Sequence, residues 1–198
     1  MHDISTLTVG LGTRAYDISV GRGLIKRADD LIGAFLNDRH IVVISDSNVA
    51  PVHLPALMMA CARVGRRCDT IEVPAGEDAK TAPVASFAWE TLGTCGFTRS
   101  DVIVGLGGGA TTDLAGFVAA TWLRGVMVIQ IPTTVLAMVD AAVGGKPGIN
   151  SDAGKNLIGS FHSPHGTHAS PTAPLLNPVT TFTWHTASLA VTLKSAGA

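Results

Sequence analysis

The sequence predicts an α/β protein in which helices cover a buried, parallel sheet. Hydrophobic residues make up 46% of the 198 residues and charged residues only 15%, with 22 glycines. Short apolar runs that end at turn residues alternate with segments of helical periodicity, which is typical of βαβ units. Both observations favour strands that are buried on both faces. A chain of this length suits one large domain, or one domain with an appendage.

Two extended segments open the chain, and two strand–helix repeats follow them. Residues 6–9 and 16–20 are the extended segments, joined by glycine-rich turns. Residues 41–44 (IVVI) predict a buried strand, 52–64 predict the helix after it, and 70–73 (TIEV) predict the next strand. Strands joined by a helix are expected to run parallel.

The same plan continues toward the C-terminus. The next helix begins at Thr81, its N-cap, tolerates Pro83 in its first turn and ends near Gly96. Two further repeats predict strands at 102–106 and 127–131 and helices at 112–123 and 135–143.

Charge and composition exclude several classes of partner. The formal net charge is -1 and the 14 Lys and Arg residues are scattered, which argues against nucleic acid. No segment gives the roughly 18 apolar residues that a membrane span needs, and the N-terminus does not read as a signal peptide. We therefore expect a soluble, cytoplasmic protein. Its 3 cysteines lack a CxxC spacing and read as reduced structural thiols.

The most informative local motif is VIVGLGGGATTD at 102–113. A glycine-rich turn between a parallel strand and a helix lets backbone N–H groups approach an anion, which the helix N-terminus also favours. This is the outline of a dinucleotide pyrophosphate site, although a merely tight strand-to-helix turn explains the glycines as well. Asp113, in the first turn of the helix, reads first as a capping acid.

Polar side chains also follow the other strands at the point where each one ends. In a binding site these groups would hydrogen-bond a ligand. Each also has a structural alternative, since such residues cap turns and helices or form solvated ion pairs. The residues are Asp46, Asn48, Glu77, Lys80, Thr133 and Thr134.

A second unusual segment is GGKPGINSDAGKN at 144–156, which combines two lysines with many glycines. Lys146 and Lys155 suit an anionic ligand such as a phosphate, and the glycines leave the backbone accessible. Asp140 lies just before this segment among small apolar residues, where a carboxylate needs a partner. Either lysine could supply it.

The last segment, 165–198, differs from the rest in composition. It contains no Asp or Glu, has Lys194 as its only Lys or Arg, and is rich in Thr, Ala, Pro and His. His165 and His168 lie among Gly, Pro and Thr, so we expect no metal site from this pair. We divide the chain into a domain at 1–164 and a divergent, low-complexity tail at 165–198, which we expect to be disordered.

The order of these motifs resembles the 3-dehydroquinate synthase family of the sugar phosphate cyclase superfamily. The match is almost gapless from GGGATTD at 107–113, through WLRGV and IPTTVLAMVDAAVGGKPGIN, to GKNLIGSFHSP at 154–164. Weaker matches lie in YDISVGRGLI, SDSNV, PAGEDAKT and FAWETL. The resemblance covers roughly residues 7–164, well beyond what a single motif supports.

The resemblance implies a Rossmann-like NAD-binding domain, which in the family precedes an α-helical metal-binding domain. Family members are lyases of the shikimate pathway of aromatic amino acid biosynthesis. They convert 3-deoxy-D-arabino-heptulosonate 7-phosphate to 3-dehydroquinate and phosphate, with transient use of NAD and with zinc or cobalt orienting the substrate hydroxyls. The family thus implies NAD as a cofactor, a sugar phosphate as the substrate and a homodimer.

The functional positions of the family carry over residue by residue. For NAD the resemblance implies Asp46, Asn48, Glu77, Lys80, Gly108, Gly109, Ala110, Thr111, Thr112, Asp113, Thr133, Thr134, Lys146 and Lys155. For catalysis and substrate binding it implies Arg124, Asp140, Lys146 and Asn156. Arg124 would reach the substrate phosphate across the dimer interface, and the segment at 144–156 would close on the substrate and cofactor.

Two departures from the family pattern bear on activity. Pro147 stands where the family has Thr, which removes a hydroxyl and a backbone donor beside Lys146. After Pro164 the family's metal-binding Glu and two His have no counterparts, and aligning SLAVTLKSAG with the first metal-ligand helix puts Val191 at the Glu position. We expect no metal site and little or no activity from this chain alone. We hypothesise that the tail reflects a shifted reading frame or a damaged gene end.

Two alternative functions stay open. The chain could be a catalytically dead NAD-binding fragment, which binding without turnover would reveal. It could also be another sugar phosphate cyclase that makes inosose or valiolone rings, although VGGKPGIN favours the dehydroquinate branch. Glycerol dehydrogenase-like enzymes share the glycine turn but lack the long match from GGK to KN.

Overall fold

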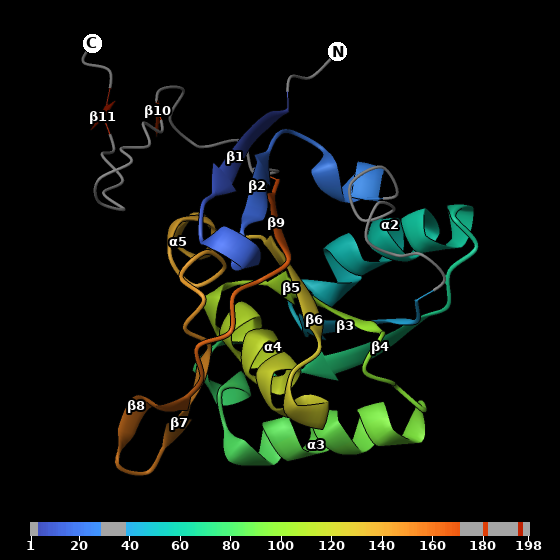
Figure 1. Ribbon diagram of the computed structural model, residues 1–198, viewed down its shortest axis with the longest axis vertical. Helices are drawn as coiled ribbons and strands as arrows, with labels where there is room; N and C mark the ends of the chain where they lie inside the picture. The colour runs from blue at the N-terminus through green and yellow to red at the C-terminus, as the bar shows by residue number, and fades with distance from the viewer. Residues whose placement is uncertain (1–3, 29–38, 171–179, 182–193, 196–198) are drawn as a thin grey trace.

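The computed structural model describes residues 4–28, 39–170, 180–181 and 194–195. Seven strands form one sheet in the order β1-β2-β9-β6-β5-β3-β4 (Figure 1). At one edge β1 and β2 pair antiparallel, and all other neighbours pair parallel. The strands are β1 (Ser5–Val9), β2 (Tyr16–Val20), β3 (Ile41–Asp46), β4 (Cys68–Val73), β5 (Val102–Gly107), β6 (Met127–Pro132) and β9 (Gly166–Ala169). The predicted α/β fold class is confirmed.

Helices connect the parallel strands, as the alternating pattern of the sequence predicts. The longer ones are α2 (Ala50–Arg63), α3 (Ala82–Thr94) and α4 (Gly109–Thr121), followed by the short α5 (Val135–Val139). Single 3-10 turns are η1 (Gly12–Arg14), η2 (Leu24–Arg27), η3 (Gly76–Ala79) and η4 (Trp122–Arg124). Among the described residues, no helix is both long and apolar enough to cross a membrane.

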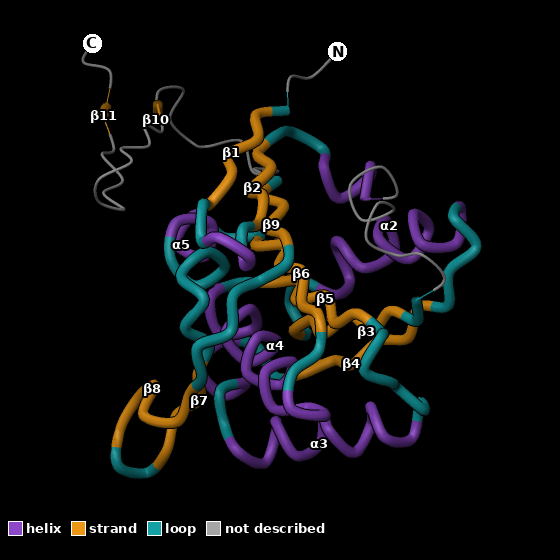
Figure 2. Tube along the Cα trace, in the orientation of Figure 1, coloured by secondary structure: helices purple, strands orange, loops and turns teal. Residues whose placement is uncertain are grey.

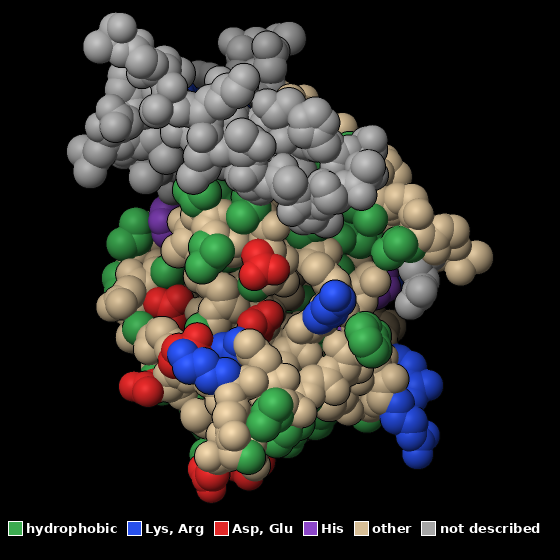
Figure 3. All heavy atoms as spheres, turned by 90° about the vertical axis from the view of Figure 1, so that its left-hand side faces the viewer, with side chains coloured by type: hydrophobic (Ala, Val, Ile, Leu, Met, Phe, Trp, Pro, Cys, Tyr) green, Lys and Arg blue, Asp and Glu red, His purple; other side chains and the backbone are tan. Residues whose placement is uncertain are grey.

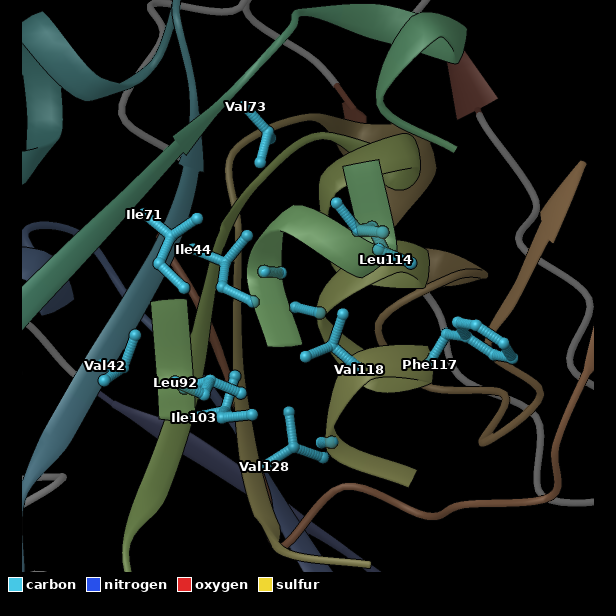
Figure 4. Close-up of a cluster of buried hydrophobic side chains, with 14 of the residues drawn as sticks. Val42, Ile44, Ile71, Val73, Leu92, Ile103, Leu114, Phe117, Val118 and Val128 are labelled. Carbon is cyan, nitrogen blue, oxygen red and sulfur yellow. The ribbon is translucent and has the colours of Figure 1, made fainter. Parts of the chain in front are cut away.

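The two faces of the sheet bury different helices because side chains alternate along a strand. In β3, Val42 and Ile44 belong to the cluster that includes residues of α3 and α4. Ile41 and Val43 of the same strand belong to the cluster that includes residues of α2. Figure 4 shows the first cluster, in which the aliphatic side chains of β3, β4 and β5 meet those of α3 and α4. This packing explains why the central strands read as continuous apolar runs.

The segment at 144–156, which the sequence analysis treats as a loop, contains most of a β-hairpin. Its strands are β7 (Gly148–Ser151) and β8 (Gly154–Gly159), and Figure 2 shows the pair standing apart from the main sheet. The sequence hides the hairpin because glycine is depleted in strands. Here the glycines allow the two strands to approach, since a Cβ on Gly159 would lie 2.7 Å from the Pro147 carbonyl oxygen.

Strand β9 is the other element that the sequence analysis missed. It lies between β2 and β6, and all four of its residues are buried. The sheet therefore extends beyond residue 164, where the sequence places the end of the first domain. From the predicted tail, the structure also describes the short strands β10 (Thr180–Thr181) and β11 (Lys194–Ser195), which pair with each other. The disorder expected for the remaining tail falls on residues outside the described ones.

Two helix boundaries also differ from the expected ones. The helix expected at 112 begins three residues earlier, because Gly109 already has the helical conformation directly after the turn. The helix expected to reach 143 ends at Val139, because Asp140 leaves the helical region with φ -136° and ψ -86°. Both differences fall at the edge of the sheet where the polar motifs gather.

Candidate functional site

The glycine-rich turn lies at the carboxyl edge of the sheet, next to the end of β6. The N–H of Thr133 donates to the carbonyl of Gly107 at 2.8 Å, so the chain segments that leave β5 and β6 remain joined past the strands. The carboxyl ends of parallel strands meet at one edge, which is where ligands bind in open α/β sheets.

The N-terminus of α4 begins at this turn. Gly108 is the N-cap with φ -75° and ψ -172°, and no side chain of the described residues caps the helix there. This extended conformation is open to any residue, so the backbone does not require glycine. Space limits the size of the residue instead, because a Cβ on Gly108 would make an ordinary contact at 3.4 Å from Thr134 Cγ2, whereas a larger side chain would fill the gap. The first N–H groups of a helix are free to bind an anion.

Two hydroxyls expected near the cofactor, those of Thr112 and Thr134, have partners within the protein. Thr112 Oγ1 donates to the carbonyl of Gly108 at 3.1 Å and to that of Gly109 at 3.0 Å. Thr134 is the N-cap of α5, and its Oγ1 accepts from the N–H of Ala137 at 3.3 Å. Thr134 remains exposed. The bond of Thr134 supports the capping alternative for that residue, and the bonds of Thr112 attach its hydroxyl to the start of its own helix.

Asp46, at the end of β3, is buried and connects that strand to α4. Its Oδ2 accepts from Thr111 Oγ1 at 2.8 Å. Its Oδ1 accepts from the N–H groups of Asn48 and Val49, both at 3.1 Å. The carboxylate therefore stabilises the turn before α2, as the structural alternative predicts, whereas Asn48 is exposed at the same edge.

Lys80 lies at the centre of the polar cluster and is only 3% exposed. Its Nζ donates to Asp113 Oδ2 at 2.6 Å and also to Asn156 Oδ1. One ammonium group thus joins three elements: the segment after η3, the N-terminal half of α4 and strand β8. Asp113, expected in the first turn of the helix, lies beyond that turn because α4 begins at Gly109. The sequence singles out all three residues but does not predict that they contact one another.

The hairpin also contacts η3 through Glu77. Glu77 Oε2 accepts from Asn150 Nδ2 at 2.8 Å and lies 3.7 Å from Lys155 Nζ. The hydrogen bond from Asn150 is the main cause that lowers the pKa of Glu77, with smaller effects from Lys80 and Lys155. Glu77 and Lys80, which the sequence offers as an ion pair with each other, have other ion-pair partners among the described residues.

Burial and neighbouring acids act together on Asp113. Burial raises the pKa of Asp113 above its usual range, against the opposing effect of the Lys80 ammonium. The carboxylates of Asp140 and Glu77 raise this pKa further. Asp113 therefore has two further acids near it, Asp140 and Glu77, in addition to its ion pair with Lys80.

The remaining candidate residues are exposed, and one of them, Arg124, lies at the other end of α4 from this cluster. Asp140, Lys146 and Lys155 are exposed, and within the described residues Asp140 forms no ion pair with either lysine. Arg124 is also exposed, at φ 69° in the turn after α4. Figure 3 shows basic and acidic side chains next to one another on the face that carries α5 and the hairpin. The exposed lysines thus provide positive charge at the surface for an anionic ligand.

Two polar residues near the site escape the sequence analysis. Asn150 bonds to Glu77 and lies in a segment where attention falls on the lysines. Gln130 is buried in β6, and its Nε2 donates to the carbonyl of Thr112 at 3.0 Å beneath the glycine turn. A glutamine inside the apolar run MVIQIP is a signal that could have been noticed, because a buried amide needs a partner.

No group of three or more potential metal-ligating side chains (His, Cys, Asp or Glu) is found in the described part of the chain. Neither ring nitrogen of the buried His168 in β9 has a hydrogen-bond partner among the described residues. The residues described here therefore do not fit a zinc or cobalt site.

Comparison with known families decides the classification. Residues 70–177 match the family described as 3-dehydroquinate synthase N-terminal. The chain belongs to the 3-dehydroquinate synthase family. The matched range contains the glycine turn, the Lys80 cluster and the hairpin, which are the features described above.

Curated relatives carry the same family name. The chain is 56% identical over 155 residues to the 3-dehydroquinate synthase of Streptomyces coelicolor, which covers 78% of this chain and 42% of that protein. It is 53% identical over 149 residues to the 3-dehydroquinate synthase of Rhodococcus opacus, and this match covers 75% of this chain and 39% of that protein. The chain thus spans less than half the length of these relatives.

Solved structures of two other sugar phosphate cyclases share the fold. One is 2-deoxy-scyllo-inosose synthase in complex with carbaglucose-6-phosphate, NAD+ and Co2+, with a TM-score of 0.77 and 26% identity over 84% of this chain and 46% of that one. The other is 2-epi-5-epi-valiolone synthase from Streptomyces hygroscopicus with NAD+ and Zn2+ bound. Its TM-score is 0.71 and its sequence identity 28%, and the match covers 79% of this chain and 43% of that one. Glycerol dehydrogenase from Schizosaccharomyces pombe, at 21% identity and a TM-score of 0.60, shares the fold alone.

Proposed function

We propose that this chain is the NAD-binding part of a cytoplasmic 3-dehydroquinate synthase, which converts 3-deoxy-D-arabino-heptulosonate 7-phosphate to 3-dehydroquinate and phosphate. The observation that carries the proposal is the position of the glycine turn. The free N-terminus of α4 lies next to the cluster of Lys80, Asp113 and Asn156, inside the range that matches the family. A phosphate-binding helix end and a polar substrate site thus share one edge of the sheet.

The turn fits a dinucleotide on two grounds. The uncapped N–H groups of Gly109, Ala110 and Thr111 can bind a pyrophosphate, and Gly108 leaves room beside Thr134 for its approach. Thr133, Glu77 and Asn48 are at least partly exposed around the turn and can hydrogen-bond the rest of the cofactor. Bound NAD would supply a hydride acceptor that returns the hydride later in the reaction.

The other residues of the chain would bind and orient the substrate. The exposed Lys146 and Lys155 supply positive charge for an anionic sugar phosphate. Asn156 and Asp140 lie beside the Lys80 cluster and can hydrogen-bond substrate hydroxyls. The family's metal has no ligand group among the described residues, so we assign no step to it.

Titration with NAD tests the cofactor site. We expect Gly108→Val to weaken NAD binding at least about tenfold, because its branched side chain fills the space beside Thr134. Gly93→Val in α3 is the matched control, since a Cβ there meets only Trp122 at 3.6 Å. Equal affinity of wild type and Gly108→Val would remove the glycine turn from the cofactor site.

A homodimer in which Arg124 acts across the interface forms part of the proposal. The side chain is exposed in the turn after α4, where it is available to a second copy, and guanidinium suits bidentate contact with a phosphate. Residues 1–164 fused to the helical domain of a complete family member allow the test. Mixing the Arg124→Ala and Lys146→Ala forms of this fusion should restore part of the activity that each lacks alone. The absence of complementation would argue for action within one chain, or for no role.

The two alternatives predict different outcomes. A catalytically dead fragment would bind NAD without releasing phosphate from the heptulosonate phosphate, with or without added zinc. Similarity to the inosose synthase complex with carbaglucose-6-phosphate keeps another sugar phosphate cyclase as the second candidate. Phosphate release from the fusion with a hexose 6-phosphate, but not with the heptulosonate phosphate, would favour that candidate.

A further inference from the structure

Asn150 occupies an irregular position in the hairpin. The pairing of β7 with β8 shifts register between Ile149 and Ser151, so Asn150 lies at a bulge and outside the regular ladder. Ile149 before it is buried in the main core, which anchors β7. Bulges redirect a side chain without ending the strand. Here the bulge turns Asn150 away from the ladder and toward the polar cluster.

Asn150 uses three polar groups there. Its N–H donates to the carbonyl of Lys80 at 2.7 Å, which attaches the hairpin to the segment after η3. Its Nδ2 donates to Glu77 Oε2 at 2.8 Å, and its Oδ1 accepts from the N–H of Asn156 at 3.0 Å. One side chain thus contacts a residue proposed for the cofactor and a residue proposed for the substrate.

Each of these contacts adds a constraint to a residue that has one other polar partner. The side chain of Glu77 is 52% exposed, and its other partner, Lys155 Nζ, lies 3.7 Å from the carboxylate. Asn156 has φ 57°, a left-handed conformation that is uncommon for a residue other than glycine. The bond to Asn150 holds the N–H of Asn156 in this conformation, from which Asn156 Oδ1 reaches Lys80.

We propose that Asn150 is a positioning residue that joins the cofactor side of the site to its substrate side. By holding Glu77 with its amide nitrogen and Asn156 with its amide oxygen, it sets the two groups at a fixed separation. The roles of Glu77 and Asn156 rest on the proposed function, whereas their link through Asn150 rests on the contacts alone. The position of the hairpin and the position of the Glu77 carboxylate are then coupled.

The test compares two substitutions that remove different parts of the link. Asn150→Asp keeps the oxygen that accepts from Asn156 but removes the donor and sets a second carboxylate beside Glu77. We expect the pKa of Glu77 to rise, as followed by carbon NMR of its carboxyl group, and NAD to bind roughly tenfold more weakly. The exchange of the Asn156 amide hydrogen should stay slow.

Asn150→Ala removes both side-chain bonds. We expect the pKa of Glu77 to rise here too, and the Asn156 amide hydrogen to exchange at least about tenfold faster. Ser151→Ala, at the next position of β7, is the control and should leave Glu77, Asn156 and NAD affinity unchanged. If Asn150 had a purely structural role, both variants would alter the stability of the hairpin alike. The pKa of Glu77 and the exchange rate of the Asn156 amide hydrogen would then change together in both variants.

Wild-type protein offers a measurement that needs no variant. The side-chain amide resonances of Asn150 should shift with the titration of Glu77, because the two groups share a hydrogen bond. Independence of these resonances from the Glu77 titration, or an unchanged Glu77 titration in Asn150→Asp, would overturn the proposal. A wild-type chain that shows this coupling but does not bind NAD would instead refute the proposed function and leave the link through Asn150 standing.

Discussion

Lys80 and Asp113 form a buried ion pair, with 2.6 Å between Nζ and Oδ2 and only 4% and 17% of their side chains exposed. The pair joins the end of η3 to the N-terminal half of α4 and so connects the segments that follow β4 and β5. Asn156 accepts a second hydrogen bond from the same ammonium, which brings the hairpin to this point. The arrangement of the candidate site depends on this contact.

Removal of the Lys80 charge should therefore destabilise the protein. Lys80→Met keeps the length of the side chain but leaves Asp113 and Asn156 without their donor in a buried site. We expect a loss of about 3 kcal/mol in the free energy of unfolding, measured with urea. Lys26→Met, at an exposed position in η2, is the control and should change little. An equal, small effect in both variants would show that Lys80 does not hold the site together.

The glycines of the turn should differ in what they tolerate. A Cβ on Gly107 would lie 2.6 Å from Thr111 Cβ, a contact that forces the helix to shift, whereas a Cβ on Gly108 would have ordinary contacts. We expect Gly107→Ala to cost about 1–3 kcal/mol of stability, from overpacking at the start of α4. Gly108→Ala should leave the thermal midpoint nearly unchanged. Similar midpoints for the two variants would contradict this difference.

The sequence predicts the parallel part of the fold because each strand there ends at a turn residue and each helix begins beside it. Ile41 to Asp46 and Val102 to Gly107 show this, with apolar runs followed directly by polar or glycine positions. The hairpin and β9 are missed because their residues are atypical of strands. β9 is GTHA, whose place in the sheet comes from pairing with β2 and β6, which are distant in the sequence.

In the candidate site, too, the sequence predicts some features and misses others. The types of residue at the strand ends reveal which side chains are polar, and the family resemblance assigns their roles. Their pairing could not be predicted, because the contact of Lys80 with Asp113 spans 33 positions and that with Asn156 spans 76. Asn150 illustrates the limit, since only the bulge of a hairpin that the sequence conceals brings it to Glu77.

His168 should make the protein sensitive to acid. Burial lowers the pKa of His168 to about 4, and in the described part of the chain neither ring nitrogen has a hydrogen-bond partner. Because the folded pKa is below the ordinary value of 6.5, the unfolded chain takes up the proton first as pH falls. The neutral ring therefore makes its full contribution to the free energy of unfolding above pH 6.5, and this contribution is lost as the pH falls from 6.5 to about 4. The loss reaches about 3 kcal/mol at the lower end.

Comparison with a variant isolates this effect from the titration of carboxylates. The free energy of unfolding of wild type and of His168→Leu should be measured from pH 7 to pH 4. The difference between them should shift in favour of the leucine variant as pH falls, since leucine cannot bind a proton. Parallel pH profiles of the two proteins would rule out His168 as the acid-sensitive group.

Gly116 and Pro147 should be energetically coupled, because the helix α4 accommodates the proline ring only where it lacks a side chain. A Cβ on Gly116 would lie 2.7 Å from Pro147 Cβ and 3.2 Å from its Cγ. We expect Gly116→Ala to destabilise by about 1–3 kcal/mol, although alanine favours a helix by about 1 kcal/mol over glycine. Gly93→Ala in α3 has no such neighbour and should be neutral or stabilising.

In a Pro147→Gly background the obstacle is gone, so Gly116→Ala should cost at least about 1 kcal/mol less there. Equal costs in the two backgrounds, measured by urea unfolding, would show that Pro147 does not pack on α4 and that another contact fixes the position of Lys146 beside it.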